Sequence, residues 1–364
     1  MHEIYIGDSE DRVTPLGAMN GTRFVPANTI LILVRGMMLK RRIPVGITTK
    51  SVTFNQDVKA LIPKAGIDPT FLLNWVIGNE NRLLDLVEES SHGTGKLPSE
   101  VLYNVEVKLP PLPEQRAIAA ILSTWDEAIT LTTRLIDALK RRKAALMQLL
   151  LTGEVRFSEF DGEWEEVILE DVAYINPPKP NVADGEQLVS FVGMADVSED
   201  ARLVNAINRK YVEVKNGFTG FQDQDVLIAK ITPCFENGKG ALVDGLRGGI
   251  GFGSTEFHVA RAILDRTTPN FIYYHTLTHR FRSFGESNMS GSAGQRRVPT
   301  EFIKSFLITL PSLSEQHRII NVLRQCDTEI DLLGEILAKL TTQKRGLMQQ
   351  LLTGAVRVQV DKEI

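Results

Sequence analysis

The chain contains one long sequence twice. Residues 109–156 and 310–357 align without a gap at a constant offset of 201, and 21 of the 48 aligned residues are identical. Unrelated leucine-rich helices would match only at scattered leucines. These segments also match at both ends, with Leu-Pro-x-Leu-x-Glu-Gln at the start and Leu-Leu-Thr-Gly-x-Val-Arg at the finish. Such a duplication indicates that the chain folds as one structural unit used twice.

Between those ends, apolar residues alternate at spacings of four and three, which is the heptad pattern of a coiled coil. Gly153 and Gly354 follow the last turns, where glycine favours a left-handed helix cap. About 33 residues at ~1.5 Å per residue give each helix a length of roughly 50 Å. We expect the two helices to pair with each other; the alternative is that each is buried separately in its own domain. The predicted seam residues are Ile118, Leu122, Trp125, Ile129, Thr132, Ile136, Leu139, Leu146 and Leu150 in the first copy and Ile319, Leu323, Cys326, Ile330, Leu333, Leu337, Leu340, Leu347 and Leu351 in the second.

Both predicted seams also carry a lysine at the same step, Lys143 and Lys344. A lysine would be costly in a closed core. At the end of a two-stranded coil its ammonium group can reach water along the helix surface, and this is the conformation we expect.

Length and composition leave several broad classes open and exclude others. With 364 residues, the chain is long enough for two or more domains. Cys234 and Cys326 are too few for a disulfide framework or a cysteine-based zinc site, which favours a reducing, cytoplasmic location. No window approaches about 18 consecutive apolar residues, so we expect no membrane insertion. The net charge of -4 means that any nucleic-acid binding must come from local patches of positive charge.

The segments before the two helices, residues 1–108 and 157–309, share a frame but not their residues. We call them the first and second modules. Both contain a Pro-x-Phe step that opens an apolar helical stretch, at Pro69 and Pro269. Shared landmark motifs separated by divergent residues indicate two modules that have the same role but bind different ligands. The strand-like runs are Thr29–Val34, Val52–Leu61, Asp225–Ile231 and Phe257–Leu264.

Local clusters of positive charge indicate that this ligand is a polyanion. The stretch Arg35–Lys64 holds seven Lys or Arg residues against one acid, Asp57. Lys and Arg would engage phosphates, while Arg, Asn and Gln side chains can read guanine and adenine edges. The alternative for each cluster is a solvated loop. The candidate DNA-binding residues are Arg35, Lys40, Arg41, Arg42, Lys50 and Lys96 in the first module and Lys230, Lys239, Arg296 and Arg297 in the second.

Motifs that would indicate catalysis fail in detail. Asn176-Pro177-Pro178 is similar to the Asn-Pro-Pro-aromatic motif of DNA amino-methyltransferases, but Lys179 replaces the aromatic residue that stacks on a flipped base. No Gly-rich cofactor loop accompanies it, so a turn is the better interpretation. Gly95-Lys96 is no phosphate-binding loop because Leu97 replaces the required Ser or Thr. The six histidines lack metal-ligand spacing, so we expect a non-catalytic chain without a metal site.

Two divergent modules, each followed by a near-identical long helix, resemble the specificity subunit of a type I restriction–modification system. The resemblance covers essentially the whole chain. The residues that carry it are Leu109–Gln115, Leu146–Gly153, Asp225–Ala241, Gly251–Val259, Leu310–Gln316 and Leu347–Gly354.

The resemblance implies an α+β fold in which two target recognition domains of mixed α/β structure are joined by two long helices. These helices would form an antiparallel coiled coil with pseudo-twofold symmetry. Each domain would read one half of a bipartite site in double-stranded DNA, and the coil would set the spacing and dock two methyltransferase subunits. Restriction or motor subunits would complete the assembly. S-adenosylmethionine and ATP with Mg²⁺ would bind the partner subunits, with no cofactor in this chain.

The implied boundaries leave the first domain short. Counting back 201 residues from Trp164, in the typical opening of the second domain, lands before Met1. We therefore expect the first domain to lack roughly the first strand and turn of its counterpart. The alternatives are a partial or decayed specificity subunit, a coiled-coil scaffold that reads no DNA, and an enzyme with an unrecognised site. The implied segments are a truncated first recognition domain at 1–108, a central helical repeat at 109–156, a second recognition domain at 157–309, a C-terminal helical repeat at 310–357 and a tail at 358–364.

Overall fold

The computed structural model describes residues 4–9, 12–14, 16–18, 22–89, 93–292 and 294–360. Parts of the predicted first domain and of the tail, including residues 1–3 and 361–364, lie outside the described residues. The chain divides into two compact units, residues 1–136 with 333–364 and residues 137–332. Among the described residues, no helix has the length and apolar character needed to cross a membrane.

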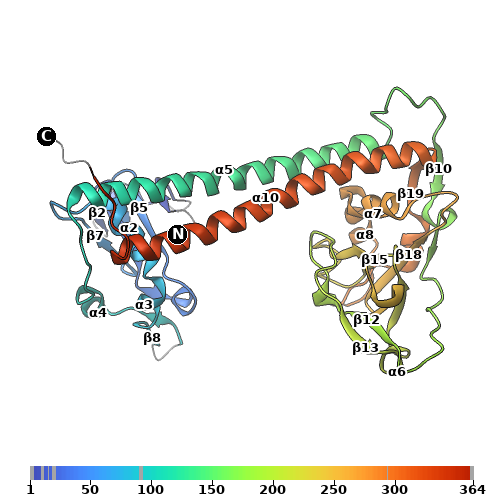
Figure 1. Ribbon diagram of the computed structural model, residues 1–364, viewed down its shortest axis with the longest axis horizontal. Coiled ribbons are helices and arrows are strands. Elements are labelled where there is room, and N and C mark those ends of the chain that lie inside the picture. Colours follow the sequence, from blue (N-terminus) through green and yellow to red (C-terminus); the bar gives the residue numbers. More distant parts are fainter. Residues whose placement is uncertain are drawn as a thin grey trace. The chain divides into compact units, whose positions relative to one another are not determined.

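The first unit contains the first module and is built on short strands (Figure 1). A four-stranded sheet has the order β1-β5-β3-β7, in which only β1 and β5 run parallel. Two smaller sheets have the orders β2-β6 and β4-β9-β8. The elements are β1 (Tyr5–Ile6), β2 (Arg23–Val25), β3 (Ile30–Leu33), β4 (Arg35–Gly36), η1 (Met37–Lys40), β5 (Val45–Thr48), β6 (Val52–Phe54), β7 (Val58–Leu61), α2 (Pro69–Gly78), α3 (Glu80–Leu84), β8 (Glu88–Glu89), β9 (Gly95–Lys96) and α4 (Ser99–Tyr103).

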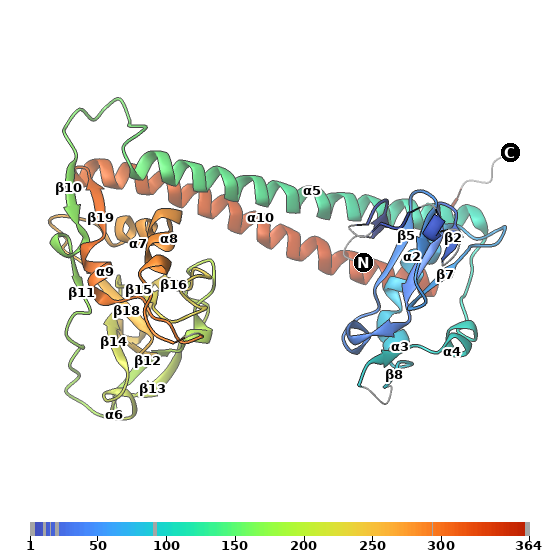
Figure 2. The ribbon, with the colours of Figure 1, turned by 180° about the vertical axis from the view of Figure 1, so that it is seen from behind.

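The second unit contains the second module, in which two four-stranded sheets have the orders β11-β18-β15-β16 and β13-β12-β17-β14. A separate antiparallel pair, β10-β19, lies at the junction with the long helices (Figures 1 and 2). The elements are β10 (Glu165–Ile168), η2 (Leu169–Asp171), β11 (Ala173–Ile175), β12 (Leu188–Val192), η3 (Met194–Asp196), β13 (Ile207–Lys210), α6 (Tyr211–Val214), β14 (Thr219–Gln222), β15 (Val226–Ala229), β16 (Gly240–Leu242), η4 (Arg247–Gly249), β17 (Ile250–Gly253), β18 (Phe257–Ala262), α7 (Pro269–Leu277), α8 (His279–Ser287), α9 (Thr300–Ser305) and β19 (Leu307–Leu310).

Equivalent helices in the two modules begin in the same way. Asp68 Oδ1 accepts a hydrogen bond from the Phe71 N–H at 2.9 Å, and Pro69 occupies the first turn of α2. Thr268 Oγ1 accepts from the Phe271 N–H at 3.2 Å at the start of α7. A capping side chain satisfies one of the free N–H groups of the first turn. Both helix starts predicted from the Pro-x-Phe steps are confirmed.

One predicted strand is wrong. The run Val52–Leu61 forms two strands, β6 and β7, which pair with different partners. Between them the Asn55 side chain accepts a hydrogen bond from the Asp57 N–H at 3.1 Å, which closes a turn. The run of strand-forming residues concealed this break. In the second unit β10 pairs with β19, whereas the equivalent stretch of the first module, residues 106–109, belongs to no strand.

The long repeats are the helices α5 (Leu112–Leu151) and α10 (Leu313–Thr353). In the first unit the N-terminal half of α5 lies beside the C-terminal half of α10, and the remaining halves pair in the second unit (Figures 1 and 2). The helices are therefore antiparallel within each unit. Every predicted seam residue is buried or half-buried. Gly153 and Gly354 have φ angles of 74° and 77°, which confirms the predicted left-handed caps.

The prediction that the seam lysines reach out to water is wrong. Lys143 Nζ lies 2.6 Å from Asp327 Oδ1, and Lys344 Nζ lies 2.5 Å from Asp126 Oδ1. These side chains are only 10% to 27% exposed, so each ion pair is part of the seam. Both lysines and both aspartates are related by the offset of 201, so the duplication repeats one interhelical ion pair. The heptad pattern missed the pair because it considers apolar positions alone.

The matching ends of the two repeats meet each other. Glu114 at the start of α5 accepts two hydrogen bonds from Arg357 beyond the end of α10, at 2.7 and 2.6 Å. Glu315 at the start of α10 accepts the equivalent pair from Arg156, at 3.0 and 2.8 Å. Bidentate arginine–carboxylate pairs are strong and fix orientation. The start and end motifs are therefore parts of one joint, which the chain contains twice.

The glutamine after each of these glutamates anchors the helix to the module before it. Gln115 Oε1 accepts a hydrogen bond from the Asp68 N–H at 2.9 Å, and Gln316 Oε1 accepts from the Thr268 N–H at 3.1 Å. Both glutamines are buried, so these bonds are shielded from water. Because Asp68 and Thr268 cap α2 and α7, each long helix is tied directly to the principal helix of its module.

The core of each module continues into the coil at equivalent positions. In both units the apolar residues come from the first turns of one long helix and the last turns of the other. Burial of an isoleucine, leucine or methionine side chain stabilises by about 1.5–3 kcal/mol. The shared positions are Ile118, Ala119, Leu122, Met348, Leu351 and Leu352 in the first unit and Ile319, Ile320, Leu323, Met147, Leu150 and Leu151 in the second.

Replacing Asp126 with alanine should leave the Lys344 ammonium group in the seam without its partner. We expect the free energy of unfolding to fall by about 2 kcal/mol, because an unpaired, partly buried charge is costly. Asp137→Ala is the matched control, since Asp137 is an exposed aspartate of the same helix. Urea denaturation followed by circular dichroism measures the difference. Equal stabilities for the two variants would contradict a stabilising role of the ion pair.

Candidate nucleic-acid interface

Two predicted DNA-binding residues of the first unit face each other across a pair of strands. The register of β4 and β9 places Arg35 opposite Lys96. Both side chains are exposed, and neither forms an ion pair with a described residue. Like charges directly opposite on neighbouring strands destabilise a sheet. On its other side Lys96 lies opposite Glu88 of β8, so the three strands align two exposed cations and one exposed carboxylate.

The helical turn η1 places the next candidates beside this pair. Lys40, at its end, forms a 2.8 Å ion pair with Glu89, whose strand β8 neighbours β9. Both partners are exposed, so the ion pair is weak and open to competition from another anion. Arg41 and Arg42 follow directly and are exposed as well. The structure thus groups five of the six candidates of the first module.

Lys50 is the exception. The register Ile30↔Ile47 places the end of β5 beside the start of β3, whereas Arg35 follows the end of β3. Lys50, which comes after β5, therefore lies near the start of β3, whereas Arg35 lies beyond the other end of that strand. It acts instead on Asp8, whose pKa is lowered first by a hydrogen bond from Ser9 and then by the charges of Arg12 and Lys50. Proximity in sequence suggested that Lys50 and Arg35 belong to one patch, but the reversal of the chain at β5 separates them.

The second unit gathers three predicted residues at the end of β15. Lys230 follows this strand, and its carbonyl oxygen accepts a hydrogen bond from the Val298 N–H at 2.8 Å. This contact brings in the loop that carries Arg296 and Arg297. Lys239 lies just before β16, where its Nζ donates to a backbone carbonyl oxygen of η3 at 3.0 Å. Lys239 is therefore held by its own module.

Both arginines of this loop contact carboxylates of the same module. Arg297 donates two hydrogen bonds to Glu256, each at 2.9 Å, and these are the main cause of the lowered pKa of Glu256. Arg296 lies 3.5 Å from Glu236, a longer contact. Lys230 forms no ion pair with a described residue. Composition could not reveal these pairings, because the carboxylates come from distant parts of the module.

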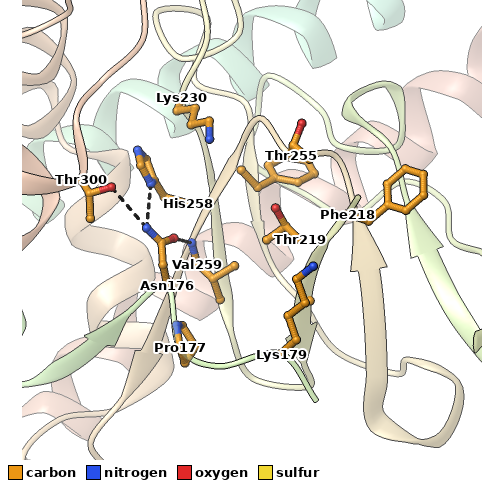
Figure 3. Close-up of a pocket in the computed structure, with 12 residues that line it drawn as sticks. Asn176, Pro177, Lys179, Phe218, Thr219, Lys230, Thr255, His258, Val259 and Thr300 are labelled. Carbon is orange, nitrogen blue, oxygen red and sulfur yellow. Dashed lines mark hydrogen bonds between the residues drawn. The ribbon is translucent and has the colours of Figure 1, made fainter. Parts of the chain in front are cut away.

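Lys230 also lines a pocket of about 260 Å³ that the sequence did not predict. Lys179, in the segment after β11, approaches the same space from the opposite side (Figure 3). Thr219, Thr255 and Thr300 add hydroxyl groups from β14, the loop before β18 and the start of α9. The sequence signal for this site is the Asn-Pro-Pro-Lys segment, which the pattern indicates only as a turn.

Asn176 fixes one wall of the pocket (Figure 3). Its φ of 53° is left-handed, a conformation that asparagine tolerates better than most residues. Its Oδ1 accepts from the Val259 N–H at 3.0 Å, and its Nδ2 lies 3.2 Å from His258 Nδ1. Burial lowers the pKa of His258, so the ring is neutral near pH 7. His258 then donates from Nε2 to a backbone carbonyl oxygen at 2.9 Å and accepts from Asn176 at Nδ1.

Comparison with known families shows which family combines two such modules with two long helices. The profile of the type I restriction modification DNA specificity domain matches residues 18–141 and 161–342, which is most of the chain. The chain belongs to this family. The two matches of the specificity domain begin in the two modules and extend into the long helices, so the resemblance predicted from the repeated ends is confirmed.

Individual relatives agree with this assignment to the specificity-domain family. The specificity subunit of the type I restriction enzyme EcoEI from Escherichia coli is 41% identical over 191 residues, which cover 52% of this chain and 32% of that subunit. The EcoAI specificity subunit from the same organism is 36% identical over 246 residues, covering 65% of this chain and 41% of that subunit. The chain thus spans less than half the length of both relatives.

A solved structure confirms the predicted fold class of the specificity-domain chain. The crystal structure of the type I restriction–modification S subunit from M. genitalium superimposes with a TM-score of 0.54. The match covers 96% of this chain and 88% of that one at 15% sequence identity. The α+β fold is therefore shared by chains of very different sequence.

Replacing Asn176 with alanine should loosen the pocket wall, because the hydrogen bond to Val259 is lost and alanine must adopt a left-handed backbone. We expect faster amide exchange in peptides that cover β11 and β18, equivalent to about 2 kcal/mol of local stability. Asn176→Gly is the matched variant. It loses the same hydrogen bonds without the backbone cost, so it should recover about 1 kcal/mol. Wild-type exchange rates in Asn176→Ala would contradict the anchoring role.

Proposed function

We propose that this chain is the sequence-specific DNA-recognition subunit of a type I restriction–modification complex and performs no chemistry itself. The observation that carries the proposal is the double match of the specificity domain, once for each module. The exposed cations Arg35 and Lys96 support it, because backbone phosphates supply much of the affinity of DNA-binding proteins.

Each module would read one half of a bipartite site in double-stranded DNA. The modules share their helix caps and joints but differ in the side chains of the candidate interface. Lys96 pairs across the strands with Arg35, whereas the equivalent Arg297 pairs with Ile231. Direct readout depends on which side chains reach the base edges. Two copies of one frame with different side chains suit two different half-sites.

The long helices would set the distance between the half-sites. They contain 40 and 41 residues and run through both units. At ~1.5 Å per residue this is about 60 Å of helix, longer than the ~34 Å of one DNA turn. The repeated Lys–Asp ion pairs would keep the helices in one register, because a buried polar pair penalises every shifted alignment.

Exposed apolar residues that repeat on both helices support the docking of two methyltransferase subunits. Leu131 and Leu135 of α5 are 55% and 48% exposed, and Leu332 and Ile336 of α10 are 55% and 46% exposed. The offset of 201 relates the two pairs. Residues four apart lie on one face of a helix. One surface present twice suits two copies of one partner.

The remaining components of the complex would be separate proteins. Restriction or motor subunits would join the methyltransferase subunits on this chain. S-adenosylmethionine would bind the methyltransferase subunits, and ATP with Mg²⁺ would bind the motor subunits, so this chain would carry no cofactor. The assembly would act in the cytoplasm, where its DNA substrate lies.

Reversing the charges of Arg35 and Lys96 to glutamate should weaken binding to specific and random DNA alike, because phosphate contacts carry no sequence information. The slope of log affinity against log salt should fall by about 1 or more. The matched control reverses Lys50 and Lys64, two exposed lysines that follow β5 and β7 at the end of the four-stranded sheet where β3 begins. Fluorescence anisotropy of a labelled duplex at several salt concentrations measures both. An equal loss in test and control, or no loss in the test variant, would reject this face.

Replacing Leu131 and Leu135 with serine should remove one docking surface and leave the other. Sedimentation of the chain with its cognate methyltransferase subunit should then show one bound copy in place of two. Adding Leu332→Ser and Ile336→Ser should leave none. Leu264→Ser, in an exposed loop of the second unit, should keep both copies. Two copies bound to the fourfold variant would show that these four residues do not dock the methyltransferase subunits.

A further inference from the structure

We propose that the pocket between Lys179 and Lys230 holds one phosphodiester group of the bound DNA. The inference rests on the proposed function and deepens it. It assigns a phosphate contact to Lys179, which lies outside the charge clusters of the sequence. The Asn-Pro-Pro-Lys segment would then position this lysine.

The pocket concentrates positive charge that the protein does not neutralise. Lys179 is exposed and Lys230 is half-buried, and neither forms an ion pair with a described residue. Figure 3 shows their ammonium groups directed into the pocket from opposite sides. The pKa of Glu256 is lowered mainly by hydrogen bonds from Arg297 and to a smaller extent by the charge of Lys230, and both Glu256 oxygens are occupied by Arg297. An anion between the two lysines would relieve their mutual repulsion.

The other polar groups and the size of the pocket favour a phosphate. Thr219, Thr255 and Thr300 line the space. Thr300 Oγ1 accepts a hydrogen bond from Asn176 at 3.4 Å, so its own hydroxyl hydrogen can be donated to a ligand. The volume of about 260 Å³ is below the ~300–1,000 Å³ of pockets that enclose a whole small molecule. A phosphodiester group at an open pocket fits better than a free nucleotide.

The backbone around Lys179 is constrained, which distinguishes this lysine from one on a loose loop. Asn176 ties the segment to β18, and the two prolines that follow restrict their φ angles. Gly220 of β14 admits the lysine stem, because a Cβ at that position would lie 3.0 Å from Lys179 Cβ and 2.9 Å from Pro180 Cδ. A side chain that starts from a fixed backbone loses less entropy when it binds.

The salt dependence of binding to a random-sequence duplex tests the pocket in the full chain. Lys179→Ala with Lys230→Ala should lower the slope of log affinity against log salt by roughly 0.9, the value for one phosphate contact. The control, Lys339→Ala with Lys140→Ala, removes two exposed lysines of the long helices and should leave the slope unchanged. Replacing both pocket lysines with arginine should retain the slope. Circular dichroism and amide exchange verify that each variant is folded.

Each other outcome overturns the pocket. An unchanged slope in the alanine variant, or an equal loss in the control, would remove the phosphate contact. A loss near 2 would mean that the lysines bind separate phosphates. If the wild-type chain shows no salt-dependent DNA binding, the proposed function itself fails.

Discussion

Each module is fixed to the long helices at a joint where the start of one helix meets the end of the other. In the second unit the side chain of Glu315 is only 2% exposed, and such a carboxylate is stable only when it is paired and hydrogen-bonded. Glu315 accepts two hydrogen bonds from Arg156 and a third from Trp164 Nε1 at 3.0 Å. In the first unit Glu114 and Arg357 repeat the pair, and a backbone N–H at 3.2 Å replaces the tryptophan. Because the partners come from opposite ends of the two repeats, neither joint forms without both helices.

The joints explain why the sequence repeats most faithfully at its ends, and they mark the limit of what a pattern predicts. The heptad spacing predicted the seam, and the glycines predicted the helix caps. Neither showed that the lysines at 143 and 344 are neutralised across the seam, because the aspartates that bind them belong to the other helix. Likewise, the turn at Asn55 that divides Val52–Leu61 depends on a local side-chain hydrogen bond that apolar periodicity does not detect.

The candidate interface was harder to predict, because a sequence does not show where a charged side chain lies in the fold or which carboxylate it contacts. Lys50 is close to Arg35 in sequence and far from it in the sheet, since β5 reverses the chain. The fold brings Arg297 near Lys230, but its charge is already engaged by Glu256. Lys179 was overlooked because its neighbours resemble a failed catalytic motif. What makes Lys179 a candidate is the fixed segment that directs it, and that follows only from the packing of Gly220 and Asn176.

The claim that two equivalent modules on paired helices read one divided site is open to a direct measurement. Selection of bound duplexes from a random pool, with the chain and its methyltransferase subunits, should enrich a motif in two parts. We predict two short specific segments of different sequence, separated by a gap of constant length. A single continuous motif, a gap of variable length, or no enrichment above random DNA would contradict the account.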